Sequence, residues 1–190
     1  MMMARYIGNF LLVFSCLFLG QCHAIKPPGT TKVKIDQEVV YLDKVNISNF
    51  EWCVYVWHRQ SVDSVDLKTY RSLLPDSILW MQRYGQSLPV KERGQSMQDI
   101  FSKIFFQQKE IKDEPVVGIS PNQAEGYCKW RTTMVNYRFE KKFKTDKRVD
   151  YTLLSDEQCL ILSKMSKWRN VHLASRNNTV NGFRCIAIMK

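Results

Sequence analysis

The sequence predicts an exported domain that mixes α-helices with β-strands. Apolar and polar residues alternate at 32–42 and again at 182–188, as in strands with one face toward a core. Between these two stretches, Ser48, Ser120 and Ser155 each precede apolar residues at helical spacing, which is how capped helices begin. The N-terminus supplies the third observation, because it has the composition of a secretory leader.

That leader begins with a basic n-region at Arg5. An apolar run from Ile7 to Leu19 ends in a cleavage-site pattern at Ala24, and it is too short and too interrupted to span a membrane. We expect residues 1–24 to be a signal peptide and 25–190 to form one domain. Two fates of the leader stay open: cleavage after Ala24, or a lipoprotein anchor on Cys22, which ends the lipobox-like sequence LGQC.

The mature chain of 166 residues is long enough for one domain with its own hydrophobic core. It has 27 Lys and Arg against 18 Asp and Glu, a formal charge of +9. Such a surplus suits nucleic acid, anionic lipid or an acidic protein, and export argues against nucleic acid. The basic residues are spread along the chain except at 138–148, where six of eleven are basic. We interpret that stretch as a solvated loop.

Four cysteines remain once the leader is removed: Cys53, Cys128, Cys159 and Cys185. In an oxidising compartment they allow three pairings, among which the sequence does not choose. Their spacing excludes a CxxC redox pair and a zinc knuckle. Of the histidines, His58 stands at the end of a predicted helix, where a cation is favourable, and it has no ligand-like spacing to the others.

In chain order, the first helix should follow Ser48 with Phe50, Cys53, Val54 and Trp57 on its buried stripe. A short buried strand is expected at 116–119.

The next helix begins with Ser120, Pro121 and Gln123, which form a capping box, and buries a stripe of four residues. These are Ala124, Tyr127, Cys128 and Arg131. A strand at 151–154 leads into a third helix, in which Ser155 and Gln158 repeat the capping box.

The region 63–114 is long and weakly patterned, with one expected helix around 97–107. Two regions stay open as the partner-binding surface: this elaboration, with Trp80 as an exposed anchor and Arg83 and Tyr84 beside it, or the basic stretch 138–148. Deleting most of 69–109 should then abolish partner binding and leave the domain folded.

Four phrases in order carry a family resemblance across about 145 residues. They are YLDKVNISNFE from Tyr41, PVVGIS with YCKW from Pro115, YTLLSDE from Tyr151 and NGFRC from Asn181. In this order and style they resemble the formylglycine-generating-enzyme (sulfatase-modifying-factor) family. The resemblance implies an α+β, C-type-lectin-like fold, shortened and with much irregular structure.

Within that family, LPDSILWM from Leu74 and KWRTTMVN from Lys129 look most like the gliding-motility and type IX secretion lipoproteins of Bacteroidetes. The resemblance therefore implies a periplasmic location, or the periplasmic face of the outer membrane, and a structural role with cell-envelope protein partners.

Active members of the family use a reactive cysteine pair that binds copper before the final GFR phrase. Here the corresponding interval, 160–181, contains no cysteine, and a thiolate is the soft ligand that such a metal requires. Calcium ligands would also come from this interval. We therefore expect no catalytic residue and no cofactor. The alternative is a minimal oxidoreductase of the same type, acting on protein cysteine through Cys53 or Cys159.

The resemblance also implies a disulfide. In the family, the cysteine of the YC helix is sometimes joined to one directly after GFR, and this chain has both, as Cys128 and Cys185. Cys53 and Cys159 would then be free and buried, or form a second bridge.

Overall fold

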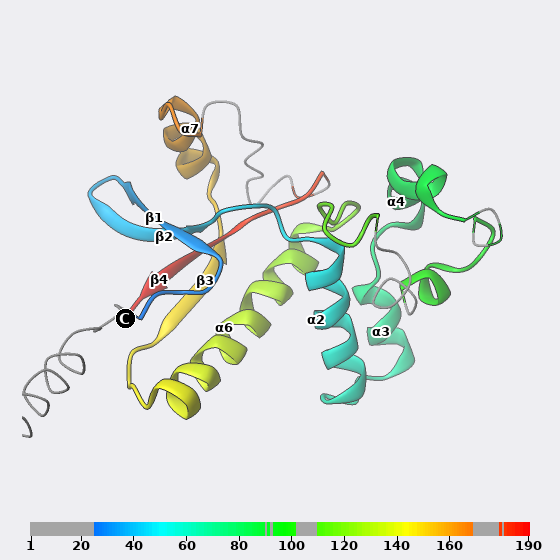
Figure 1. Ribbon diagram of the computed structural model, residues 1–190, viewed down its shortest axis with the longest axis horizontal. Helices are drawn as coiled ribbons and strands as arrows, with labels where there is room; N and C mark the ends of the chain where they lie inside the picture. The colour runs from blue at the N-terminus through cyan, green and yellow to red at the C-terminus, as the bar shows by residue number, and fades with distance from the viewer. Residues whose placement is uncertain (1–24, 90, 92, 102–109, 169–178, 180) are drawn as a thin grey trace, which may run out of the picture.

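The computed structural model describes residues 25–89, 91, 93–101, 110–168, 179 and 181–190 (Figure 1). Within them, the chain forms a four-stranded antiparallel sheet in the order β1-β2-β4-β3, with helices on both faces. The strands are β1 (Thr30–Ile35), β2 (Glu38–Asp43), β3 (Val149–Leu153) and β4 (Cys185–Met189). This architecture confirms the α+β class.

The first two strands form a hairpin rather than one continuous alternating strand. Asp36 and Gln37 make its two-residue turn and both have positive φ angles, 45° and 69°, as the twist of a tight hairpin demands. The turn resets the alternation, so that β2 buries Val40 and Leu42 while Val39 is exposed. The alternation predicted across 32–42 therefore does not continue through the turn.

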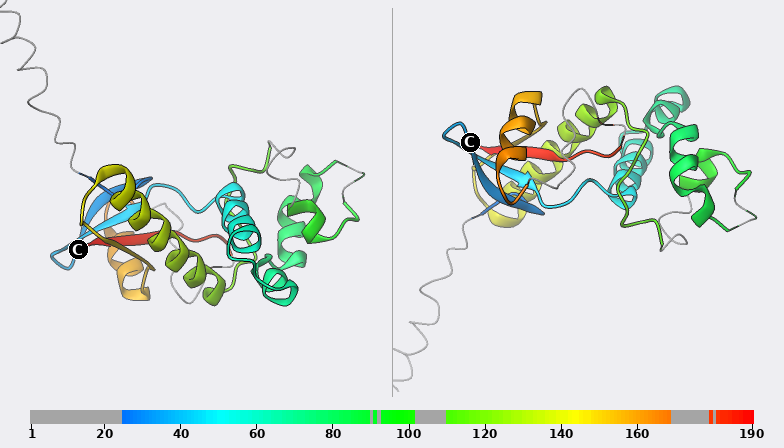
Figure 2. Two further views of the ribbon diagram at one scale, coloured as in Figure 1. Left: turned by 90° about the horizontal axis from the view of Figure 1, so that it is seen from below. Right: turned by 90° about the horizontal axis from the view of Figure 1, so that it is seen from above.

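Three helices begin with the predicted capping boxes: α2 (Asn49–Ser61), α6 (Pro121–Phe143) and α7 (Asp156–Lys164). Helix α6 packs along β3 on one face of the sheet, and α7 covers the other face beside β1 (Figures 1 and 2). The two faces have separate hydrophobic clusters, and the larger one includes α2 and α6. The sheet is therefore a central layer between helices.

Helix α6 buries the predicted stripe of Ala124, Tyr127, Cys128 and Arg131. The helix continues to Phe143, and the chain leaves it through Lys144, whose φ is 49°. More than half of the basic stretch 138–148 is therefore helical. The prediction of a loop there is wrong, because the apolar stripe of α6 extends to the buried ring of Phe139.

Helix α2 has the predicted cap and period, but its buried face is offset by one residue. Asn49, Trp52, Cys53 and Val56 are buried, and Trp57 is exposed. The reason is a long-range contact: the amide of Asn49 donates to the carbonyl of Ile111 at 3.0 Å and turns this face inward.

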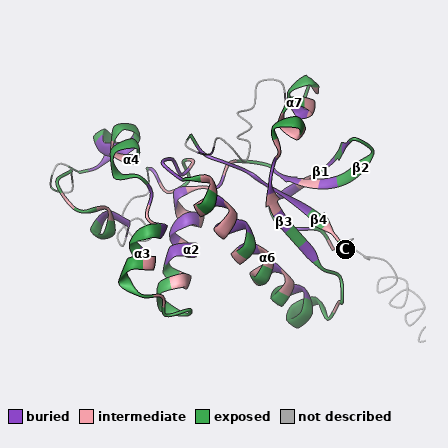
Figure 3. Cartoon of the chain, turned by 180° about the vertical axis from the view of Figure 1, so that it is seen from behind, coloured by how far each residue is buried: buried purple, intermediate pink, exposed green. Residues whose placement is uncertain are grey.

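The elaboration at 63–114 contains α3 (Leu67–Leu73), α4 (Ser77–Tyr84) and the 3-10 turn η1 (Gly85–Ser87). Residues 97–101 are helical, and the rest of the helix expected at 97–107 lies outside the described residues. Tyr70, Trp80 and Ile100 belong to the same buried cluster as the core residues of α2 and α6. Figure 3 shows buried residues on both of these helices. The elaboration supplies core, which contradicts the expectation that the domain folds without it.

Candidate functional site

The segment 115–119 positions α4 at the surface. Residues 116–119 are buried as predicted, but the predicted strand is wrong: Pro115 makes an isolated bridge with Ser48, and Gly118 bends the backbone with a positive φ angle. Val116 N–H donates to the carbonyl of Ile47 at 2.9 Å, and Asp76 N–H donates to the carbonyl of Gly118 at 2.8 Å. The side chain of Asp76 then caps α4 by accepting from Leu79 N–H at 2.9 Å.

Gly118 is required for this junction. Its φ is +74°, and an added Cβ would lie 3.0 Å from the carbonyl oxygen of Asp76. The close approach of the two backbones fixes where α4 begins.

A hollow of about 430 Å³ lies between α4 and the segment 115–117. Its lining combines apolar and polar side chains, namely Leu79, Gln82, Arg83, Tyr84, Pro115, Val117 and Asn181. On the solvent side of α4, Ile78 is 67% exposed and Leu79 is 37% exposed. Sequence reasoning missed these two residues; the spacing that separates them from Trp80 and Tyr84 on a short capped helix was the available signal.

The opposite face of α4 points into the core. Trp80 is fully buried, its Nε1–H donates to Asn49 Oδ1 at 2.9 Å, and its ring lies 5.7 Å from that of Phe101. Tyr84 is also buried, and its hydroxyl donates to the carbonyl of Pro115. Trp80 is therefore a core residue, and the prediction of an exposed anchor is wrong because Asn49 and Phe101 enclose its ring.

Arg83 is the predicted contact residue that faces solvent. It lines the hollow, and its guanidinium carbon lies 6.0 Å from the centre of the Tyr84 ring. Among the residues that the structure describes, it has no carboxylate partner. A hollow of mixed polarity beside a cation that lacks a carboxylate partner can accept a ligand that carries both an apolar group and a carboxylate.

A buried ion pair joins α6 to the sheet. Arg131 Nη1 lies 2.8 Å from Asp43 Oδ2, and Arg131 Nη2 donates to the carbonyl of Pro28 at 3.1 Å. The Arg131 guanidinium also stacks over the ring of Tyr151 at 4.3 Å. Asp43 Oδ2 accepts a further hydrogen bond from Cys185 N–H at 2.9 Å, whereas Asp43 Oδ1 has no hydrogen-bond partner.

Burial raises the pKa of the Asp43 carboxyl above its ordinary value, and the Arg131 guanidinium works against that rise. Burial alone would lower the pKa of Arg131, but the Asp43 carboxylate outweighs it and raises that pKa. The guanidinium therefore stays charged. We assign the pair a structural role, since it ties α6 to β2 and β4 inside the protein.

Cys128 and Cys185 meet beside this pair. Both are buried, and their Sγ atoms lie 2.9 Å apart, compared with about 2.0 Å in a disulfide. The structure shows them as thiols. Burial, reinforced by the neighbouring Cys128, raises the pKa of the Cys185 thiol well above its ordinary value. The fold thus brings the two predicted partners together, and the disulfide stays a prediction.

The other two thiols, of Cys53 and Cys159, have raised pKa values. Burial raises the pKa of Cys53 to about 12, and burial with the Asp156 carboxylate raises that of Cys159 to about 11. Cys53 packs in the cluster around α2 and α6, and Cys159 packs in the cluster under α7. The fold does not bring them together as a second bridge.

Several sequence predictions concern residues outside the described part of the chain. The leader 1–24, the lipidation candidate Cys22 and half of the interval 160–181, namely 169–178 and 180, belong to this group. His58 lies at the C-terminal end of α2 as expected, with Nδ1 3.7 Å from Asp63 Oδ1. Across the described residues, no group of three or more His, Cys, Asp or Glu side chains is arranged to hold a metal ion, and no helix is long and apolar enough to cross a membrane.

No protein-family model matches the chain, and neither a curated protein nor a solved structure matches it.

Proposed function

We propose that this protein is a non-catalytic interaction protein of the bacterial cell envelope, of the sulfatase-modifying-factor type and with a C-type-lectin-like fold. Its place would be the periplasm or the periplasmic face of the outer membrane, with gliding-motility or type IX secretion components as partners. The family phrases and the leader of the sequence support the location. The hollow beside α4 supports binding.

The observation that carries the proposal is the contrast between the two faces of α4. The inner face is fixed by Trp80 and Tyr84, whose polar atoms bond to Asn49 and Pro115. The outer face exposes apolar side chains and Arg83 around a hollow. A helix that is anchored on one face and presents a hollow lined by apolar and polar side chains on the other is typical of a binding surface.

The chemistry of this surface indicates a peptide segment with an apolar side chain next to a carboxylate. The apolar side chain would contact Leu79 and Val117, and the carboxylate would pair with Arg83. Burial raises the pKa of Cys53 to about 12, and burial with the Asp156 carboxylate raises that of Cys159 to about 11, so neither thiol is a ready nucleophile near neutral pH unless a metal ion binds it.

A photo-crosslinking experiment in the native envelope tests the proposal. A photoreactive amino acid at position 79 should capture a protein partner, whereas the same group at Leu160 of α7, which is 57% exposed, should not. Leu79→Glu and Arg83→Glu should each abolish co-purification of that partner, and Leu160→Glu should preserve it. Equal capture at positions 79 and 160, or co-purification that survives both α4 variants, would exclude this surface.

Thiol titration with and without copper tests the alternative. If copper protects a pair of thiols that includes Cys53 or Cys159, the protein is instead a minimal oxidoreductase acting on protein cysteine. We expect copper to leave the reactivity of both thiols unchanged.

A further inference from the structure

The end of α6 carries the densest charge in the chain. Residues 138–148, which we call the basic end, comprise the last turns of α6 and the segment that leads into β3. Six of these eleven residues are basic and two are acidic, and all six basic side chains are exposed. They are Arg138, Lys141, Lys142, Lys144, Lys147 and Arg148.

Internal ion pairs neutralise little of this charge. Glu140 is the shared partner of Lys141, at 3.0 Å, and of Arg148, at 3.8 Å. Within the described part of the chain, the other four basic residues and Asp146 form no ion pair. The basic end therefore has a net charge of +4 at the protein surface.

Exposed aromatic rings lie among these cations. Tyr137 is 62% exposed and Phe143 is 44% exposed. The guanidinium carbon of Arg138 lies 5.9 Å from the centre of the Phe143 ring, and the ammonium of Lys141 lies 6.0 Å from that of Tyr137. Aromatic rings mixed with basic residues are typical of protein surfaces at the boundary between membrane and water.

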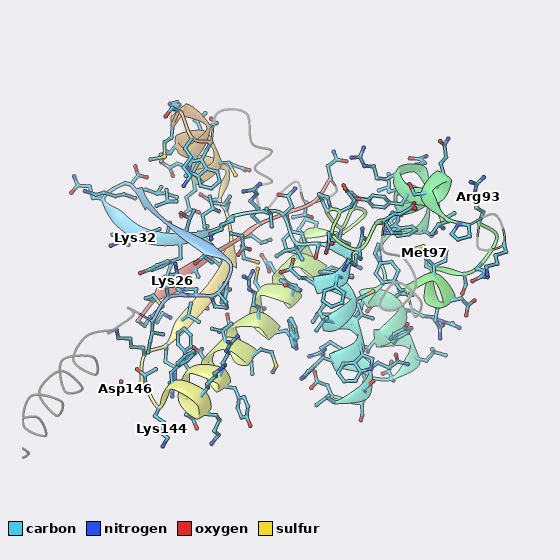
Figure 4. The ribbon with its side chains drawn as sticks, in the orientation of Figure 1. Lys26, Lys32, Arg93, Met97, Lys144 and Asp146 are labelled. Atoms are coloured by element: carbon cyan, nitrogen blue, oxygen red, sulfur yellow. The ribbon has the colours of Figure 1, made fainter. Side chains whose placement is uncertain are left out.

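The described chain starts at the same end of the molecule. The carbonyl of Pro28 accepts a hydrogen bond from Arg131 of α6 at 3.1 Å, which holds this segment against the helix. Figures 1 and 4 show that Lys26 and the end of α6, with Lys144 and Asp146, lie on one side of the protein and α4 lies on the other.

Both fates of the leader add to this arrangement. An acyl group on Cys22 would be three residues from Ile25, which is at most about 11 Å of extended chain. Cleavage after Ala24 would instead leave a positively charged α-amino group at Ile25, on the same side.

We propose that the basic end docks on the surface of a bilayer that contains anionic phospholipid. Lysine and arginine side chains would contact the headgroups, and Tyr137 and Phe143 would enter the interface. The surface proposed for the protein partner lies at the opposite end, so docking would leave the hollow beside α4 accessible. The inference goes beyond the proposed function and does not depend on the hollow.

Vesicle co-sedimentation of the full chain, purified as the cell processes it, tests the inference. Vesicles of phosphatidylethanolamine with phosphatidylglycerol are compared with vesicles of phosphatidylcholine, so that any neutral contribution from a lipid anchor is subtracted. The test variant is Lys142→Glu with Lys144→Glu and Lys147→Glu. The matched control reverses three exposed cations of the other end, Lys68→Glu, Arg71→Glu and Lys91→Glu.

A cation near an anionic bilayer contributes about fivefold in affinity, so the test variant should lose roughly 100-fold or more of the anionic-lipid preference. The control variant should keep it within about threefold, and added salt should abolish it for the wild type. Both variants should keep the wild-type circular dichroism spectrum. Equal losses in both variants, no preference for anionic vesicles, or capture of an acidic protein by the basic end in place of vesicles would overturn the inference. Failure of crosslinking at position 79 would leave it standing.

Discussion

Replacing Arg131 by methionine tests the energetic role assigned to the buried ion pair. The substitution keeps an apolar side chain of similar length but removes the charge 2.8 Å from Asp43. Asp43 would then remain buried with one hydrogen bond, from Cys185 N–H. Breaking a buried pair in this way costs about 3–5 kcal/mol. This cost includes the lost stacking of the Arg131 guanidinium on Tyr151. We expect the free energy of unfolding to fall by about 4 kcal/mol.

The ionisation of Asp43 gives this variant a specific pH dependence. Burial raises the Asp43 pKa and Arg131 opposes the rise, so removing Arg131 should raise that pKa further. A carboxyl whose pKa is higher in the folded than in the unfolded chain destabilises the fold above the folded-state pKa. This cost disappears as the pH falls through the folded-state pKa toward the unfolded-state value. The difference in stability between Arg131→Met and wild type should therefore narrow on acidification.

Urea denaturation at a series of pH values measures both the loss of unfolding free energy and its dependence on pH. The double variant Arg131→Met with Asp43→Asn should cost about 2 kcal/mol less than the sum of the single variants, because no charge is left buried without a partner. As a control, Arg148→Met removes an exposed cation 3.8 Å from Glu140 and should cost less than about 1 kcal/mol. Additive single costs, or a gap that widens on acidification, would refute the reasoning.

Three further predictions concern the core and the backbone. Gly118→Ala should cost at least about 1 kcal/mol because of its φ of +74° and the 3.0 Å approach to Asp76, whereas Gly94→Ala, with open space around its Cβ, should be close to neutral in the same thermal melts. Trp80→Ala should lower the free energy of unfolding by about 3–5 kcal/mol in urea titrations, and a stable domain lacking 69–109 would contradict the core role of Trp80. Non-reducing peptide mapping should yield a linked Cys128–Cys185 peptide, worth about 4 kcal/mol of stability, and alkylation of both thiols in the native exported protein would count against it.

The starts of α2, α6 and α7 were predictable because their signals are local. Ser48, Ser120 and Ser155 each cap a helix through the backbone N–H three residues later, and both members of each capping box lie within four residues. The buried stripe of α6 was also predictable from its helical spacing. Short-range patterns of this kind need no knowledge of the rest of the fold.

The features that were missed depend on long-range contacts. Asn49 determines which face of α2 is buried, and its partner Ile111 is 62 residues away. Asn49 also accepts the hydrogen bond of the buried Trp80, which is 31 residues away. The candidate site was anticipated only in part, since Arg83 lines the hollow whereas Trp80 is in the core. Helices α3 and α4 are short, so their local signals were limited to their aspartate caps and, on α4, to the spacing of its apolar residues.

Asn49 has a consequence for the opening motions of the protein. Its side chain bonds at once to the carbonyl of Ile111 and to the indole of Trp80, so three segments distant in sequence share one polar group. Detaching α4 alone would leave the buried oxygen of Asn49 without its donor, which is unfavourable. We therefore expect α2 and α4 to behave as one cooperative unit in hydrogen exchange, with their slowest amides sharing a single opening free energy, and an Asn49→Ala variant to let α4 exchange on its own.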